Sequence, residues 1–304
     1  MFGLFPPKLG KLQARKESQG LLAALKYQYD SQIRAEAATA LGNLGATDAT
    51  EALIQAMKDY DAAVRQAAVK ALDQLGWQPN SDEERGLSII ARQQWTEAKG
   101  LGKEAVPHFL RVLYDQSDRV RRNAESALIQ IGAPAAEILA EEISQSVLVE
   151  TDTGLAISVP AKTYQDRMIN LLVRIGEPAV APLITKLLQT TETCDSLGIA
   201  LGKIGSPALT QLLEILQADN AHARAVAIIA LRTIKDPTTL EPIVLALQDT
   251  SAKVRAEAVL ALGEFGNENH LGVLEGCLKD RDRYVREQAQ SAFSKLKSRL
   301  ARKP

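Results

Sequence analysis

The sequence contains few of the residues on which most metal and redox sites depend. There are two cysteines and three histidines in 304 residues, and Cys194 and Cys277 are too far apart to form a metal-binding or disulfide motif. Only 4% of the residues are aromatic, which disfavours an aromatic-lined nucleic-acid groove. Lysine plus arginine, 36, nearly equals aspartate plus glutamate, 37, so no net charge draws the chain to nucleic acid or anionic membranes.

Long apolar segments and catalytic motifs are also missing. No apolar stretch is long enough to span a membrane, and Pro6, Pro7 and Lys8 interrupt the short apolar start that a signal peptide would need. We find no phosphate-binding loop, no dinucleotide fingerprint and no nucleophile with a base. We therefore expect a soluble, cytoplasmic protein that is not an enzyme and has no cofactor, no metal and no membrane partner.

What the sequence does contain is a thirteen-residue pattern that recurs along the chain. Its clearest copy is VRAEAVLALGEFG at 254–266, where the apolar residues fall on one helical face and a glycine ends the helix. Close copies begin at Ile33, Val64 and Val120. The closing residue returns about every thirty residues, which is typical of a repeat protein, at positions 45, 76, 102, 132, 176, 205, 235, 266 and 297.

Each copy is preceded by a second apolar stretch, so the repeating unit is a helical hairpin. Pro134, Pro178 and Pro207 follow closing glycines, where a proline starts the first helix without losing a hydrogen bond. One hairpin cannot bury its apolar face alone and must stack on the next. The predicted fold is therefore all-α: a single α-solenoid domain over residues 1–304, built of about nine hairpins, some of them degenerate.

Two recurring residue types in the second helix of each hairpin have a structural interpretation. Alanines at its fifth and eighth positions let neighbouring helices approach closely, namely Ala37, Ala40, Ala68, Ala71, Ala124, Ala127, Ala258 and Ala261. An arginine at its second position often follows an aspartate, and the pairs could form a charged binding surface. We favour aspartates that cap the helix and arginines that bond across repeat boundaries, for Asp30, Asp61, Asp118 and Asp282 with Arg34, Arg65, Arg121, Arg224, Arg255 and Arg286.

Two segments in the first third depart from the pattern. Residues 1–17 are expected to cap the open end of the first repeat, with a membrane-surface segment at Phe2, Leu4 and Phe5 as the alternative. Residues 77–102 look like a compressed repeat, with a helix capped by Ser81 that runs to about Lys99. The two tryptophans, Trp77 and Trp95, either pack this irregular junction, which we favour, or mark a binding surface.

Two further segments lie near the middle and the end of the chain. Residues 146–160 alternate apolar and polar residues around a Thr-Gly pair, which predicts a small β-hairpin insert. Such an insert is either a binding element on the edge of the solenoid or an inert loop. Residues 298–304 form a basic tail, which we interpret as part of a solvated terminal cap.

The VRxxAxxALxxIG pattern resembles that of the HEAT-repeat superfamily, in its short-repeat PBS-lyase HEAT-like branch, from Gly20 to Leu300. That branch includes bilin lyases and their chaperones, deoxyhypusine hydroxylases and adaptors without catalytic activity. A hydroxylase of this kind holds iron with His-Glu dipeptides in several repeats, but none of His108, His222 and His270 is followed by glutamate. The resemblance therefore implies the fold and leaves the function open.

Three functions are compatible with these observations. The leading hypothesis is a non-catalytic scaffold that binds another protein along the concave face of the solenoid. The alternative is a bilin lyase-like or chaperone-type HEAT protein, which would need a pocket with acidic or histidine groups on that face. The second alternative is a nucleic-acid-binding HEAT protein, which the low aromatic content disfavours.

The third, seventh and tenth positions of each second helix point away from its apolar face, so they are predicted to line the concave groove. In the first half of the chain these positions carry basic residues, and in the second half an aliphatic stripe, which is either exposed for binding or buried by curvature. The predicted partner is a protein or peptide with an acidic segment and an apolar end. The candidate partner-binding residues are Lys70, Arg92, Lys99, Arg122, Ile199, Ile229 and Leu260.

Overall fold

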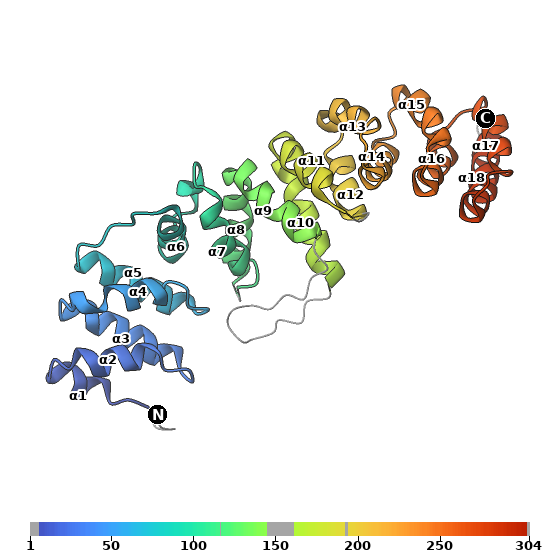
Figure 1. Ribbon diagram of the computed structural model, residues 1–304. Helices are drawn as coiled ribbons and strands as arrows, with labels where there is room; N and C mark the ends of the chain where they lie inside the picture. Colours follow the sequence, from blue (N-terminus) through green and yellow to red (C-terminus); the bar gives the residue numbers. More distant parts are fainter. Residues whose placement is uncertain (1–5, 116, 145–160, 192–193, 303–304) are drawn as a thin grey trace. The chain divides into compact units, whose positions relative to one another are not determined.

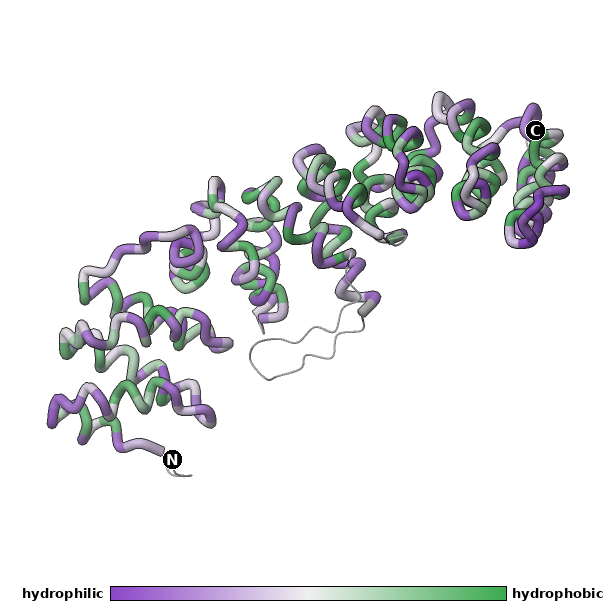
Figure 2. Tube along the Cα trace, viewed as in Figure 1, coloured by the Kyte–Doolittle hydropathy of each residue, from purple (hydrophilic) through white to green (hydrophobic). Residues whose placement is uncertain are grey.

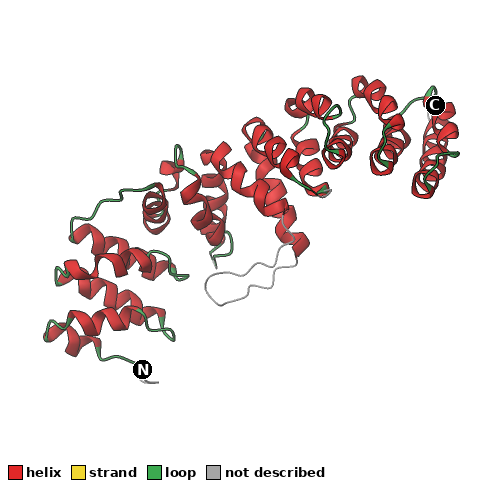
Figure 3. Cartoon of the chain, in the orientation of Figure 1, coloured by secondary structure: helices red, strands yellow, loops and turns green. Residues whose placement is uncertain are grey.

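The computed structural model describes residues 6–115, 117–144, 161–191 and 194–302. Within these ranges every regular element is an α-helix or a short 3-10 helix, and no strand occurs (Figure 3). The prediction of an all-α fold is therefore confirmed. The β-hairpin predicted at 146–160 lies outside the described residues.

The chain divides by its contacts into two compact units, residues 1–135 and 136–304. That all 304 residues form one solenoid domain stays a prediction. The helices of unit 1 are α1 (Leu9–Ala14), α2 (Ser18–Leu25), α3 (Ser31–Asn43), α4 (Thr50–Ala56), α5 (Ala62–Gln74), α6 (Asp82–Arg92), α7 (Val106–Val112) and α8 (Asp118–Ile131) (Figure 1).

The boundary between the two units falls within α9 (Ala133–Ser144), and the remaining helices belong to unit 2. They are α10 (Ala161–Ile175), α11 (Val180–Gln189), α12 (Asp195–Ile204), α13 (Leu209–Ile215), α14 (Ala221–Ile234), α15 (Leu240–Leu245), α16 (Ala252–Phe265), α17 (His270–Cys277) and α18 (Arg283–Ala301) (Figure 1).

The helices pair into hairpins with a short first helix and a longer second helix. Examples are α4 with α5 in unit 1 and α13 with α14 in unit 2. Pro178 and Pro207 lie in 3-10 turns, Glu177–Ala179 and Ser206–Ala208, that lead directly into the first helix. In Figure 2, hydrophobic and hydrophilic residues alternate along these helices, as expected for amphipathic helices.

The second helices of successive hairpins stack closely on one another. All eight alanines predicted to allow this approach are fully buried. The approach is closest at the tenth position of the helix, where a Cβ atom added to Gly42 would lie 2.7 Å from the Cα of Ala71. A Cβ on Gly263 would lie 2.6 Å from the Cβ of Ala292. Where the tenth position is glycine, as at Gly42 and Gly263, it packs against the next helix rather than lining a groove, whereas Asp73 at the tenth position of α5 is exposed.

Most predicted helix caps and stops are confirmed, with exceptions at Asp118, at Lys297 and at the end of α6. Asp30, Asp61 and Asp282 each accept a backbone N–H bond at the start of a second helix. Asp118 instead is the first residue of α8 and pairs with Arg121. Lys297, predicted as a closing residue, lies inside α18, which continues to Ala301 and so includes part of the basic tail.

Four of the six second-position arginines bond an aspartate across a repeat boundary, as predicted. Arg286 instead donates to the carbonyls of Asp280 and Arg281 in the turn before its own helix. Arg34 forks onto both carboxylate oxygens of Asp59, with Nε and Nη2 distances of 2.7 and 3.0 Å. The Nη1 of Arg34 donates to the carbonyl of Tyr27 in the turn before its own helix. We call this set of bridges the arginine ladder. Its carboxylate pairs are Arg34–Asp59 and Arg65–Asp115 in unit 1, and Arg224–Asp249 and Arg255–Asp280 in unit 2.

The segment predicted as a compressed repeat, 77–102, contains a single α-helix, α6. Ser81 caps it by accepting from the N–H of Glu84, as expected, but the helix ends at Arg92 instead of running to Lys99. Gln93 then adopts a left-handed conformation, φ 59°, and a 3-10 helix follows over Trp95–Ala98. The sequence predicted a longer helix because its apolar residues keep the helical spacing beyond Arg92. A residue in the left-handed conformation cannot be part of an α-helix, so α6 ends there.

The tryptophans and the start of unit 1 contribute to packing. Trp95 is buried edge-to-face on Phe109, with ring centroids 6.4 Å apart, and Trp77 packs against the core of unit 1. Helix α1 lies against α2 and α3, and its Leu9 is buried in the same core. Phe2, Leu4 and Phe5 lie outside the described residues.

Candidate functional site

The second helices of unit 1 expose one polar side. On α3 the exposed residues follow the spacing i, i+4, i+7, which places them on one helical face, and α5 and α8 do the same. Hydrogen bonds connect these helices through α6, because Arg92 bonds Asp73 of α5 and Arg119 of α8 bonds Gln93. We call this surface the polar face of unit 1, and its residues are Gln32, Glu36, Thr39, Lys70, Asp73, Arg92, Arg119, Arg122 and Ser126.

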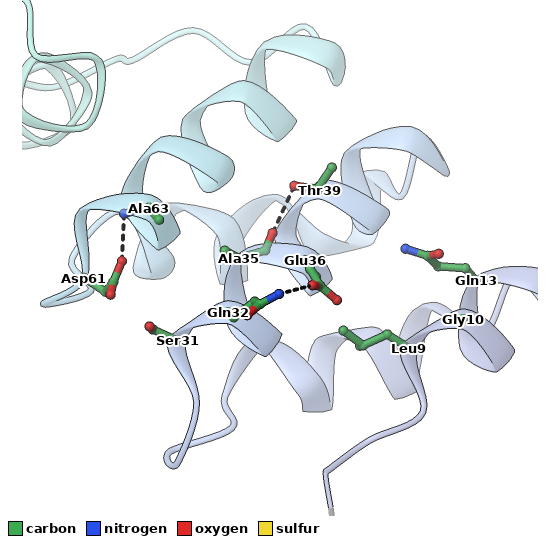
Figure 4. Close-up of a pocket in the computed structure, with 10 residues that line it drawn as sticks. All are labelled: Leu9, Gly10, Gln13, Ser31, Gln32, Ala35, Glu36, Thr39, Asp61 and Ala63. Carbon is green, nitrogen blue, oxygen red and sulfur yellow. Dashed lines mark hydrogen bonds between the residues drawn. The ribbon is translucent and has the colours of Figure 1, made fainter.

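A cavity of about 620 Å³ opens at the α1 end of the polar face (Figure 4). Helix α1 supplies one wall, α3 another, and the start of α5 the third. Its size is that of pockets which hold small organic ligands. The lining residues are Leu9, Gly10, Gln13, Ser31, Gln32, Ala35, Glu36, Thr39, Asp61 and Ala63.

The cavity wall is acidic and rich in hydrogen-bonding groups. Gln32 donates from Nε2 to Glu36 at 3.0 Å, and Asp61 accepts from the N–H of Ala63 at 2.8 Å (Figure 4). Burial alone would raise the pKa of Asp61, but hydrogen bonds from Ser31 and from backbone N–H groups, together with the charge of Arg34, lower it below its usual value. Asp61 is therefore ionised at neutral pH, and the cavity carries carboxylate groups without a lysine or arginine in its lining.

The four basic candidates from the sequence lie in unit 1, but their surroundings differ. Lys70, Lys99 and Arg122 are exposed. Arg92 is half-buried and held, since it donates to Asp73 at 2.8 Å and to Ser88 at 2.9 Å. Lys99 follows the 3-10 helix rather than lying on a helix face as predicted. Lys70 and Arg122 are thus exposed cations on helices of the polar face, as is Arg119, which also bonds Gln93.

The aliphatic candidates lie in unit 2, and of the two interpretations left open for them, exposure or burial, burial applies at the centre of the stripe. Ile229 of α14 has only 3% of its surface exposed, while Ile199 and Leu260 are half-buried. The flanking third-position residues Ala225 and Ala256 are fully buried. Of the two interpretations of this stripe, burial by neighbouring helices is therefore correct for Ile229.

The cause is the close packing of three second helices, α12, α14 and α16. A Cβ on Gly198 of α12 would lie 3.1 Å from Cγ2 of Ile229, so α12 covers this side of α14. Helix α16 packs on the other side of α14, where Glu257 lies 3.4 Å from Arg232 of α14. Ile229 is therefore covered by close packing between these second helices.

The histidines do not converge on a metal site. In the ranges that the structure describes, no three His, Cys, Asp or Glu side chains are placed to hold a metal ion. His108 lies with its Nε2 3.3 Å from Glu83, which also binds Lys58 at 2.9 Å. Burial and the charge of Lys58 lower the pKa of His108, and Glu83 offsets this only in part. The absence of a resident metal stays a prediction.

The repeat geometry and the arginine ladder agree with a family comparison. A sequence model of HEAT repeats matches residues 18–92 and 209–294, which is more than half of the chain. The chain belongs to the HEAT-repeat family. This HEAT-repeat protein matches no curated protein in the comparison made here.

Solved structures with similarity to this HEAT-repeat protein share few of its residues. A human deoxyhypusine hydroxylase in complex with glycerol is 22% identical over 95% of this chain and 99% of its own, with a TM-score of 0.34. A structure of Kap95p with RanGDP is 16% identical over 97% of this chain, with a TM-score of 0.41, and this chain spans 42% of its length. An engineered protein is 18% identical, over 96% of this chain and 92% of its own, with a TM-score of 0.31.

The described helices include none that is long and apolar enough to cross a lipid bilayer. Sequence reasoning missed the residues of the cavity, such as Glu36 and Asp61, because it compared only the third, seventh and tenth positions of each second helix. The signal was present at the fourth position of the first copy, where Glu36 stands one turn after Gln32.

Proposed function

We propose that this HEAT-repeat protein is a non-catalytic scaffold that binds another protein on the polar face of unit 1. The observation that carries the proposal is the contrast between equivalent helices. The third and seventh positions are exposed or half-exposed polar residues on α5 and α8, whereas on α14 they are buried Ala225 and Ile229. An exposed charged side chain contributes little to folding, so Lys70 and Arg122 are free to serve recognition.

The partner that fits these residues carries an acidic segment, which Lys70 and Arg122 attract and orient. The apolar end of this partner stays a prediction without an assigned contact. Ile229 is buried, and the half-buried Ile199 and Leu260 belong to unit 2.

Charge reversal tests this proposal. The partner would first be identified by affinity capture from the source cells and then purified. Lys70→Glu/Arg122→Glu should weaken its binding at least about tenfold at low salt and less at high salt. The matched control is Lys203→Glu/Lys279→Glu, which makes the same charge change at exposed positions of unit 2. If both variants bound the partner with equal affinity, the polar face would not be the binding surface.

A second candidate, a lyase or chaperone for an open-chain tetrapyrrole, is favoured by the cavity. Such a role needs an acidic pocket on the face formed by the second helices, and the cavity lined by Glu36 and Asp61 is one. Biliverdin added to the protein should then show a shifted visible absorption band, and Glu36→Gln should reduce the shift. An unchanged spectrum would contradict this candidate and leave the scaffold proposal untouched.

A further inference from the structure

Tyrosines gather in the turns that join the two helices of each hairpin in unit 1. Tyr27 and Tyr29 lie between α2 and α3, Tyr60 between α4 and α5, and Tyr114 between α7 and α8. Tyr29 has 77% of its surface exposed and Tyr60 has 52%. Aromatic side chains rarely stay so exposed without an interaction that uses them.

The arginine ladder holds these turns side by side. Arg34 donates to the carbonyl of Tyr27 and to the carboxylate of Asp59, and its guanidinium carbon lies 4.9 Å from the ring centroid of Tyr60. The rings of Tyr27 and Tyr29 meet edge-to-face, with centroids 5.6 Å apart. Tyr29 and Tyr60 therefore belong to one surface, which we call the tyrosine edge.

The ladder does not require a tyrosine at this position of the turn. In the turns, Arg65 donates to the carbonyl of Tyr60, and Arg255 donates in the same way to the carbonyl of Thr250. In two other hairpins of unit 2 the equivalent carbonyls belong to Asp219 and Arg281. The ladder thus uses the backbone at this position and accepts a small, acidic or basic side chain. Tyr60 adds a contact of its ring with Arg34, while most of the Tyr29 side chain is exposed.

Several charges near the tyrosine edge are paired within the protein. Asp59 is paired with Arg34 and Asp115 with Arg65, each at 2.7 Å, and Lys58 is paired with Glu83 at 2.9 Å. Asp30 and Asp61, which follow Tyr29 and Tyr60, accept backbone N–H bonds as helix caps. The exposed rings can therefore select a ligand by ring stacking and hydrogen bonding.

The spacing of the turns identifies such a ligand. Packed helices lie about 8–10 Å apart, so the turns that precede α3 and α5 are separated by about that distance. A polyproline II helix repeats every three residues at about 3.1 Å per residue, which gives about 9 Å per turn. Prolines three residues apart would therefore lie over successive tyrosines. The backbone carbonyls of such a segment have no internal hydrogen bonds and can accept from tyrosine hydroxyl groups.

We propose that the tyrosine edge of unit 1 binds a proline-rich segment of a partner protein in the polyproline II conformation, with Tyr29 and Tyr60 as the stacking residues. This surface is formed by turns and is distinct from the polar face on the second helices. The proposal therefore does not depend on the proposed function.

Fluorescein-labelled decaproline tests the inference directly by fluorescence anisotropy with the full-length protein. Tyr29→Thr/Tyr60→Thr places at both turns the residue that unit 2 has at position 250, and it should weaken decaproline binding about tenfold or more. Tyr284→Thr, which removes an exposed tyrosine from unit 2, should leave the affinity unchanged. Circular dichroism verifies folding, and Tyr29→Thr alone serves if the double variant does not fold.

Three results would overturn the proposal. The first is that decaproline binds no more tightly than a labelled glycine-serine decapeptide. The second is that the double variant and Tyr29→Thr both retain the wild-type affinity. The third is that a glycine-serine peptide carrying arginines binds the tyrosine edge more tightly than decaproline, which would assign the rings to cation–π recognition instead.

Discussion

The Nη2 of Arg65 bonds the carboxylate of Asp115 at 2.7 Å, across fifty residues of sequence, whereas Arg34, Arg224 and Arg255 each bond an aspartate 25 residues further along. The ladder in unit 1 therefore bypasses α6 and the residues around it. The segment 77–102 fills space between hairpins without contributing a ladder bridge to Arg65, which explains how a compressed repeat is tolerated within a regular stack.

Removal of a ladder arginine should be costly. Arg255 is 4% exposed and its hydrogen bonds to Asp280 hold the pKa of that carboxyl below its usual value. Arg255→Ala leaves Asp280 without its partner, so we expect the free energy of unfolding to fall by about 3 kcal/mol in urea titrations. The control is Arg283→Ala, which breaks an exposed pair with Glu287 and should change stability by less than about 0.5 kcal/mol. Equal losses would show that the ladder bridge is not a buried ion pair.

The glycine at the tenth position of α16 should tolerate no side chain. Gly263→Ala places a methyl group 2.6 Å from the Cβ of Ala292, and overpacking of this kind costs about 1–3 kcal/mol. Gly272→Ala in α17 meets no atom within 4 Å and should instead stabilise by about 0.5 kcal/mol, because alanine favours the helix. Thermal unfolding of the two variants should therefore shift in opposite directions. A rise for both would mean that α16 and α18 can separate at no cost.

The protein should be less stable at acidic pH, where His108 takes up a proton. Its pKa in the folded protein lies below the ordinary value of 6.5, so below pH 6.5 the unfolded chain binds the proton more readily than the folded chain does. The free energy of unfolding should then decrease between pH 7 and pH 5. The matched variant His108→Gln should show a smaller decrease over this interval. A wild-type protein that gains stability on acidification relative to this variant would show that the ion pair with Glu83 outweighs burial.

Ile229→Asp should destabilise the protein rather than only disturb binding. Ile229 is 3% exposed, and a carboxylate there would be desolvated without a partner, at a cost of at least about 3 kcal/mol. Lys70→Asp, at an exposed position of α5, should leave the unfolding midpoint nearly unchanged. If Ile229→Asp protein retained wild-type stability in urea, the packing of α12 over α14 would be wrong.

The elements that local chemistry determines could be predicted from the sequence. A glycine after a helix-period run predicts a left-handed stop, and Gly45, Gly76, Gly132, Gly176 and Gly205 all have positive φ. An aspartate before such a run predicts a cap, which holds at Asp30 and Asp61. The bonds of the arginines across repeat boundaries could also be predicted, because an arginine that recurs in most repeats of a stacked fold can reach an aspartate in the next repeat.

The features that depend on how helices stack could not be predicted. The period of 3.6 residues says which side chains share a face of α14, but burial of Ile229 depends on the small residues of α12 and on the packing of α16. The cavity is likewise formed by three helices, since α1 closes over positions of α3 and α5 that a regular repeat would leave open. The end of α6 at Arg92 depends on one left-handed residue, Gln93, which is not a glycine and gives no signal in the sequence.

The arginine ladder also has a mechanical consequence within unit 1. Arg34 and Arg65 are each tied to the turn before their own helix and to an aspartate in a later turn, so this edge of the stack has a fixed length. The opposite ends of α3 and α5 lead into glycines with positive φ, Gly45 and Gly76, whose backbone rotates at little cost. A bending load would therefore spread the glycine connections while the ladder edge acts as an inextensible strap, and these hairpins would flex in one direction only.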